Sequence, residues 1–337
     1  MACRISTEYS RRGLDVVFLE NDHLRVEVLA GKGADITEIR DKRTDTNVLF
    51  ETPHEWCPPT TGLAGSPDAS FAFLDHYPGG WQDVLPAAGG PAEIHGAPLA
   101  LHGEAPIVHW GTSITADTDD RVAATFSVSL SRYPFDIVRT VTLESGSPEL
   151  HVDETVTNRG EVSVHYSWLQ HIALGEPLIS PDARLDVPCE TVLADPNQPP
   201  NAQLPAGVTF DWPTCDIGSE TVDLQEFPPK EERIHDIAAL TDLEAGRYTV
   251  TNPAIDLGVS VRFPEELFEY LWYWRALGGF EDAPFFGRNY NVGLEPCTSI
   301  PNAGIEAAVE NDTANEIGPG ETVTATIEVE THDPNGE

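Results

Sequence analysis

The chain has 337 residues, 40% of them hydrophobic, which is enough for one large domain or two ordinary ones with a real core. Its 19 basic and 56 acidic residues give a formal net charge of −37. Because no basic stripe could neutralise phosphates, this charge argues against a nucleic-acid-binding protein. The acidic residues are scattered along the whole chain, so we expect adaptation to high salt rather than a functional acidic patch.

The five cysteines are odd in number, far apart in the sequence and never arranged as Cys-x-x-Cys; they are Cys3, Cys57, Cys189, Cys215 and Cys297. This usage favours reduced thiols over a disulfide framework or a zinc site. The N-terminus has no apolar signal segment, and no apolar run is long enough to span a bilayer. We therefore expect a cytoplasmic protein without membrane contact, and the sequence leaves its oligomeric state open.

Apolar and polar residues alternate with a period of two in many segments, which predicts antiparallel strands with one wet face. The clearest segments are 24–29, 124–130, 137–143, 150–156 and 322–329. No long stretch has helical periodicity, no repeat of about 20–50 residues occurs, and no linker divides two cores. The sequence therefore predicts one all-β domain over residues 1–337, a large antiparallel β-supersandwich that holds its ligand on a concave sheet face.

Two segments combine residues suited to a ligand pocket. Between residues 78 and 110 the chain carries Gly79-Gly80-Trp81 and then His102-Gly103-Glu104. Glycines permit close backbone approach, and a tryptophan offers a flat apolar platform. Far downstream, Asn291-Val292-Gly293-Leu294-Glu295-Pro296 places one carboxylate at the end of a predicted strand. This combination indicates a pocket for a neutral polyhydroxylated ligand, a sugar above all, with a His/Glu acid–base pair.

Three segments in this order resemble the aldose 1-epimerase (galactose mutarotase-like) superfamily. The first, Gly79-Gly80 through Pro86 and Gly89 to His102-Gly103-Glu104-Ala105 and Trp110, is similar to the branch that contains glucose-6-phosphate 1-epimerases. The second runs from Val156-Thr157-Asn158-Arg159-Gly160 into Ser167–Gly175, and resembles the strand that presents the family's catalytic histidine. The third is the Glu295 segment, similar to the one that bears the catalytic carboxylate.

The resemblance implies an isomerase that interconverts the anomers of an aldose by opening and reclosing the ring. Such chemistry needs one group that removes the anomeric hydroxyl proton and one that protonates the ring oxygen. By resemblance, Glu295 is the general base, His171 is the general acid, and His102 hydrogen-bonds the sugar. The chemistry requires no metal and no organic cofactor.

Four further residues are candidates with ordinary structural alternatives. Trp81 is expected to stack on the sugar, although any core accepts a tryptophan. Asp236 is placed where relatives often bind a hydroxyl, and Arg275 is a second candidate for substrate binding. In the segment 271–275, alternation puts Trp272 and Trp274 on one face and Tyr273 and Arg275 on the other, and does not say which face meets the sugar. His95, in a similar Ile-His-Gly setting, competes with His102.

One position departs from the phosphosugar branch. There, the His-Gly-x-Ala motif is followed by an arginine that holds the substrate phosphate, whereas this chain has Pro106. Arg40 and Arg275 could still form a phosphate site. The substitution and the strongly negative charge favour an unphosphorylated aldose or a close derivative.

Three other functions compete with this interpretation. A non-catalytic carbohydrate-binding protein on the same fold would keep the aromatic residues while Glu295 and His171 did little. A polysaccharide lyase or hydrolase would need an accompanying helical domain or a second carboxylate across the site, and neither is evident. A metal-dependent cupin-type isomerase would need closely spaced histidines, whereas those here are scattered. The sugar and the pathway stay open.

Overall fold

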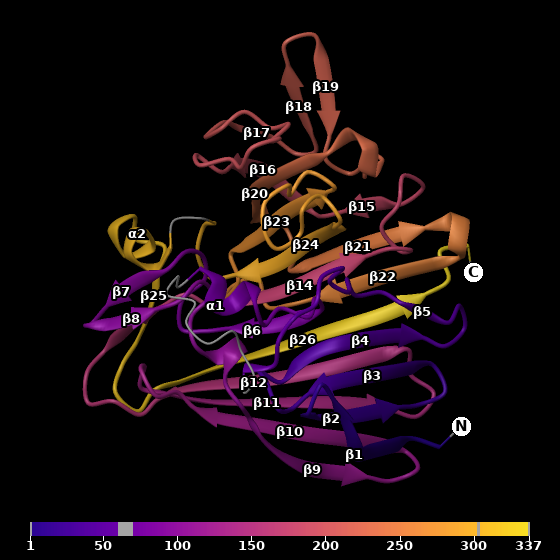
Figure 1. The fold of residues 1–337 in the computed structure, drawn as a ribbon, viewed down its shortest axis with the longest axis vertical. Coiled ribbons are helices and arrows are strands. Elements are labelled where there is room, and N and C mark those ends of the chain that lie inside the picture. Colours follow the sequence, from indigo (N-terminus) through magenta and orange to yellow (C-terminus); the bar gives the residue numbers. More distant parts are fainter. Residues whose placement is uncertain (1, 60–69, 302–303, 336–337) are drawn as a thin grey trace.

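A computed structural model describes residues 2–59, 70–301 and 304–335 (Figure 1). Almost all regular structure within these ranges is β, and the ladders between named strands are antiparallel, which confirms the predicted all-β supersandwich. Helix is confined to short pieces: α1 (Phe71–Leu74), α2 (Gly304–Glu310), and the 3-10 turns η2 (Ala105–Ile107), η3 (Lys230–Glu232) and η4 (Pro253–Ile255). None of the helices in these ranges has the length and apolar character needed to cross a membrane.

The larger sheet has twelve strands in the spatial order β1-β2-β3-β4-β6-β14-β24-β23-β20-β16-β17, with β5 paired to β4. Their bounds are β1 (Arg4–Arg11), β2 (Leu14–Glu20), β3 (Leu24–Leu29), β4 (Asp35–Asp41), β5 (Thr46–Asn47), β6 (Trp81–Val84), β14 (Leu169–Gly175), β16 (Cys189–Ala194), β17 (Thr209–Asp211), β20 (Ile234–Leu243), β23 (Tyr270–Leu277) and β24 (Tyr290–Cys297).

The smaller sheet has eight strands in the order β15-β21-β22-β26-β12-β11-β10-β9. Their bounds are β9 (Gly111–Asp117), β10 (Arg121–Ser129), β11 (Phe135–Glu144), β12 (Glu149–Asn158), β15 (Arg184–Asp186), β21 (Arg247–Asn252), β22 (Leu257–Arg262) and β26 (Thr322–His332). The five clearest alternating segments of the sequence lie in β3, β10, β11, β12 and β26, so their prediction as strands is confirmed. Both sheets draw strands from both halves of the chain, while the single-domain organisation stays a prediction.

Three two-stranded ladders complete the fold: β7 (Ala92–Ile94) with β8 (Ala97–Leu99), β13 (Val164–Tyr166) with β25 (Asn315–Ile317), and β18 (Thr214–Ile217) with β19 (Glu220–Asp223). The β18–β19 hairpin belongs to the stretch 196–229, which is rich in Pro, Asp and Thr. Figure 1 shows this hairpin projecting from the top of the molecule, away from the two large sheets.

One face of the larger sheet packs on the smaller sheet. Because side chains alternate along a strand, every second residue of the central strands points into this core. The core includes Trp81 of β6, Ile172 of β14 and Leu294 of β24, packed with Phe126, Ile137 and Val152 of the smaller sheet. Burial of this apolar surface is the main stabilising contribution to such a sandwich.

The opposite face of the larger sheet is also covered at its centre. All residues of β14 and β24 are buried, including those that point away from the smaller sheet. The residues on this second face, such as Ala173, pack with Phe50, Phe73, Tyr77 and Phe285, which come from loops and from α1. A cavity can therefore form on the sheet with walls supplied by distant segments.

A buried polar network links the two sheets behind β14. Arg139 of β11 pairs with Glu154 of β12, with Nε and Oε1 3.0 Å apart and both side chains fully buried. Glu154 Oε2 accepts a hydrogen bond from Gln170 at 2.6 Å, and Gln170 in turn accepts one from the Trp81 indole at 2.8 Å. The Arg139 guanidinium lies 4.7 Å from the centre of the Trp81 ring. The ion pair and these hydrogen bonds offset part of the cost of burying the two charged groups.

We expect Glu154→Gln to destabilise the fold, because it removes the carboxylate that pairs directly with the buried Arg139 guanidinium. Loss of one partner of a buried ion pair costs about 3–5 kcal/mol of unfolding free energy. Urea denaturation in high salt would measure this change. Glu161→Gln, at an exposed position, is the matched control and should change the unfolding free energy very little. Equal stability of the two variants would show that the pair contributes nothing.

We also expect stability to increase with ionic strength. The 19 basic residues can neutralise only part of the 56 acidic ones, and the excess charge repels itself in dilute buffer. Thermal melts in rising KCl should therefore shift to higher temperature over the molar range. A Tm that is flat or falls with salt would contradict salt adaptation.

Candidate functional site

Strand register places the two predicted catalytic residues opposite each other. In the antiparallel ladder of β14 and β24, Leu169 pairs with Cys297 and Ala173 pairs with Gly293, so His171 lies across from Glu295. His171 Nε2 and Glu295 Oε1 are 3.5 Å apart, on the face that points away from the smaller sheet. The Glu295 carboxylate folds over Gly293, where any Cβ would collide with it. The glycine therefore makes room for this conformation of the carboxylate.

Burial sets the charge of the pair. The two side chains are about 5% and 4% exposed. Removal from water lowers the pKa of His171 to about 4 and raises the pKa of Glu295 well above its ordinary range. Burial therefore favours a neutral imidazole beside a protonated carboxyl group. His171 Nδ1 and Glu295 Oε1 are buried with no hydrogen-bond partner among the described residues. Both atoms are therefore available to form hydrogen bonds with a ligand.

His102 is the third polar group on this face. Its Nδ1 accepts a hydrogen bond from the Gly89 backbone N–H at 3.3 Å, which leaves the ring hydrogen on Nε2. The ring centre lies 5.2 Å from that of His171 and 4.7 Å from that of Phe73. Burial, reinforced by His171, lowers the pKa of His102 well below its ordinary value, so the ring offers a neutral N–H donor.

These three residues line a cavity of about 290 Å³ whose other walls are mainly aromatic. Phe73, Leu74 and Tyr77 come from α1 and the segment after it, and Phe280 and Phe285 from the loop between β23 and β24. The remaining lining residues are Gly89, Gly90, Leu101, His235, Ile237, Trp272 and Trp274. A largely apolar cavity with a few convergent polar groups is typical of a small-molecule site.

The structure brings together His171, Glu295 and His102, whereas three other predicted residues lie elsewhere. Trp81 points into the core between the sheets, where Gln170 and Arg139 contact it, and it does not reach the cavity. Asp236 and Arg275 lie on that same hidden face and bind each other at 2.9 Å. Strand alternation explains this placement, because the residues next to Asp236 and Arg275 in the sequence, rather than these two, line the cavity.

Those neighbours are His235, which the sequence does not single out, and Trp274, for which the sequence leaves open whether its face meets the sugar. Trp274 Nε1 donates a hydrogen bond to His235 Nε2 at 3.1 Å. Counting alternation from Glu295 across the paired strands β24, β23 and β20 would have found both, had the pairing been known. The aromatic residues of α1 and of the 280–286 loop lie outside the strands, so strand alternation could not have identified them as lining residues.

Of the two competing histidines, His102 lines the cavity and His95 does not. His95 lies in the turn between β7 and β8, stacks on His165 with ring centres 5.8 Å apart, and is absent from the cavity lining. His102 lies beside His171.

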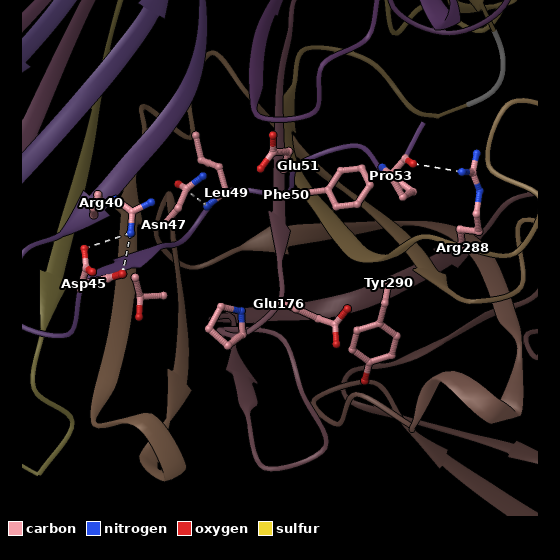
Figure 2. A pocket seen from close by; sticks show the side chains of 12 residues that line it. Arg40, Asp45, Asn47, Leu49, Phe50, Glu51, Pro53, Glu176, Arg288 and Tyr290 are labelled. Carbon is pink, nitrogen blue, oxygen red and sulfur yellow. Dashed lines mark hydrogen bonds and ion pairs between the residues drawn. The ribbon is translucent and has the colours of Figure 1, made fainter. Parts of the chain in front are cut away.

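Arg40 lines a different pocket. Figure 2 shows it beside Asp45, with Nη1 and Oδ1 3.1 Å apart, while Arg288 at the other end donates to the Pro53 carbonyl. Phe50 lines this second pocket, and its ring packs against Phe285 of the first cavity. Arg40 and the His171–Glu295 pair therefore do not share one site.

No Lys or Arg is among the described residues that line the first cavity. Within the same described ranges, no three His, Cys, Asp or Glu side chains gather in an arrangement that could hold a metal ion.

Comparison with solved structures shows the fold alone, because every identity is low. A Klebsiella pneumoniae protein provisionally named as an aldose 1-epimerase superposes with a TM-score of 0.74 at 16% identity, covering 98% of this chain and 83% of that one. An Escherichia coli K12 protein with the same provisional name gives 0.65 at 15% identity, over 95% and 100% of the two chains. A galactose mutarotase-like protein from Clostridium acetobutylicum gives 0.64 at 11% identity, over 98% and 99%.

No functionally curated protein matches the sequence. The model of one family, the domain of unknown function DUF4432, matches residues 11–331 and thus nearly the whole chain. The chain therefore belongs to the DUF4432 family, and its fold is galactose mutarotase-like.

Proposed function

We propose that this protein is a mutarotase of the aldose 1-epimerase type, which interconverts the anomers of a neutral aldose. The observation that carries the proposal is the His171–Glu295 pair, two proton-transfer groups 3.5 Å apart in a cavity lined by aromatic rings. Low-identity structural similarity to proteins provisionally named as aldose 1-epimerases supports the same reaction class.

The resting protonation states suggest how the reaction begins. The neutral imidazole of His171 takes the proton of the anomeric O1–H, while the carboxyl group of Glu295 gives its proton to the ring oxygen. The C1–O5 bond breaks, C1=O forms, and the open aldehyde rotates about C1–C2. Reclosure on the other face of C1 returns a proton from His171 to O1 and one from O5 to Glu295.

These initial roles are the reverse of those that the family resemblance implies for the two residues. Each group gives and takes a proton during one complete turnover, so the state in which the cycle starts decides which one acts first as acid. Burial favours neutral forms of both, and so favours Glu295 as the first acid.

The substrate is unphosphorylated in this proposal. No described Lys or Arg lines the cavity, Arg275 is tied to Asp236 on the other face of the sheet, and Arg40 lines the second pocket. A phosphate group in the first cavity would lose its hydration with no cation to compensate it.

Polarimetry of freshly dissolved α-glucose and α-galactose, with and without protein in high salt, tests the function. We expect Glu295→Gln and His171→Asn each to lower kcat by at least ~100-fold, because each removes one proton-transfer group while keeping a similar shape. Glu310→Gln, at an exposed position on α2, is the control and should leave kcat unchanged. A protein that binds sugar without accelerating mutarotation would instead be a carbohydrate-binding protein on this fold.

The pH profile of kcat/KM should be flat through neutrality. With its pKa lowered to about 4, His171 stays able to accept a proton until the pH falls to that range, and activity is lost below it. Because burial raises the pKa of Glu295, this group ionises, and activity is lost, only at a pH well above the ordinary range of a carboxyl group. Circular dichroism at each pH separates this loss from unfolding. An acid limb near pH 6.5, the ordinary value of histidine, would contradict the buried neutral pair.

A further inference from the structure

His235 lies across the cavity from the His171–Glu295 pair. Glu295 of β24 pairs in register with Trp272 of β23, whereas His235 of β20 pairs with Ala276 of β23. His235 is therefore two strands across and four residues along the sheet from Glu295, roughly 16 Å between Cα atoms at ordinary strand spacing. Both side chains line the same cavity, so they approach it from opposite sides.

Trp274 lies between the pair and His235. Its ring centre is 6.0 Å from that of His171, and its Nε1 donates a hydrogen bond to His235 Nε2 at 3.1 Å. The tryptophan ring thus forms a wall that runs from the acid–base pair to His235. An aldopyranose packed against this ring can meet the pair on one side and His235 on the other.

The contact with Trp274 fixes which nitrogen of His235 can bind a ligand. An indole N–H only donates, so Nε2 must accept and the ring hydrogen lies on Nδ1. Phe280 stacks on the imidazole with ring centres 4.6 Å apart and an interplanar angle of 16°, which holds the ring plane. Burial lowers the pKa of His235 to about 4, so the ring stays neutral. No described residue hydrogen-bonds to Nδ1, and His235 therefore offers the cavity one donor and no acceptor.

We propose that His235 is a specificity-determining residue that donates its Nδ1–H to a hydroxyl oxygen of the sugar at C3 or C4. The assignment rests on the proposed function, because the acid–base pair fixes C1 and the ring oxygen, and C3 and C4 lie on the opposite side of a pyranose ring. The substrate class is accordingly an aldopyranose with a hydrogen-bond acceptor at one of these carbons. A hydrogen atom in its place would leave the N–H buried without a partner.

Deoxy and fluoro sugars test the proposal, because fluorine accepts a weak hydrogen bond but cannot donate one. The 3-deoxy, 4-deoxy and corresponding fluoro sugars are compared with their parent hexoses, D-glucose and D-galactose, by NMR exchange between anomers. We expect kcat/KM to fall by about 10- to 100-fold for the deoxy sugar at the recognised carbon, the scale of an unpartnered buried donor, and by less for the fluoro sugar. Unchanged kcat/KM for both deoxy sugars, or a fluoro sugar as poor as the deoxy sugar, would overturn the proposal.

Two substitutions separate the nitrogens of His235. Asparagine places an N–H near the Nδ1 position and gives up the contact with Trp274, whereas glutamine places an oxygen near the Nε2 position, keeps that contact and gives up the donor. We expect His235→Asn to keep the discrimination against the deoxy sugar and His235→Gln to lose it. His23→Gln, at an exposed position, is the control and should keep the wild-type discrimination. Discrimination that is kept in His235→Gln, or lost in both variants, would show that Nδ1 does not carry the recognition.

Calorimetric binding of the same sugars separates this proposal from the proposed function. If parent sugars bind more tightly than the deoxy sugars while no mutarotation is accelerated, recognition by His235 stands and the catalytic function fails. If mutarotation is accelerated without discrimination at C3 or C4, the catalytic function stands and the role of His235 fails. If no sugar binds or turns over, both fail.

Discussion

The chemistry of the site depends on one constraint, the register between β14 and β24 at the centre of the larger sheet, where both faces are closed to water. Register sets His171 opposite Glu295, and Gly293 leaves space for the carboxylate. Closure then changes the chemistry of both groups, because burial disfavours charge on either. On a wet sheet the glutamate would be ionised at neutral pH and the histidine would titrate near neutrality. Here burial favours a neutral acid and a neutral base, 3.5 Å apart.

The two faces of the larger sheet divide the tasks of stability and recognition. One face carries the apolar core and the Arg139–Glu154 network, which bind the smaller sheet and hold the central strands in place. The other face carries the cavity, whose aromatic cover comes from α1 and the 280–286 loop. Rings fixed in this way supply shape and exclude water, while the few polar groups at one end orient the ligand.

Much of the fold was predictable because strands with one wet face alternate visibly, as 137–143 and 150–156 do. The strands that carry the candidate pair, β14 and β24, are buried on both faces and lose that alternation, so His171 could be proposed only through family resemblance, whereas Glu295 also stood out as a carboxylate at the end of a predicted strand. Trp81, Asp236 and Arg275 lie away from the cavity for a related reason. Sequence spacing tells which residues share a face, but only the pairing of strands tells which face meets the cavity.

The central claim is that one sugar is held with its anomeric centre between His171 and Glu295, and a crystal structure soaked with D-glucose or D-galactose in high salt tests it most directly. We expect O1 and the ring oxygen to lie within hydrogen-bond distance, about 2.6–3.2 Å, of these two side chains. A sugar bound in the pocket of Arg40 and Arg288, or with C1 pointing away from the pair, would contradict it.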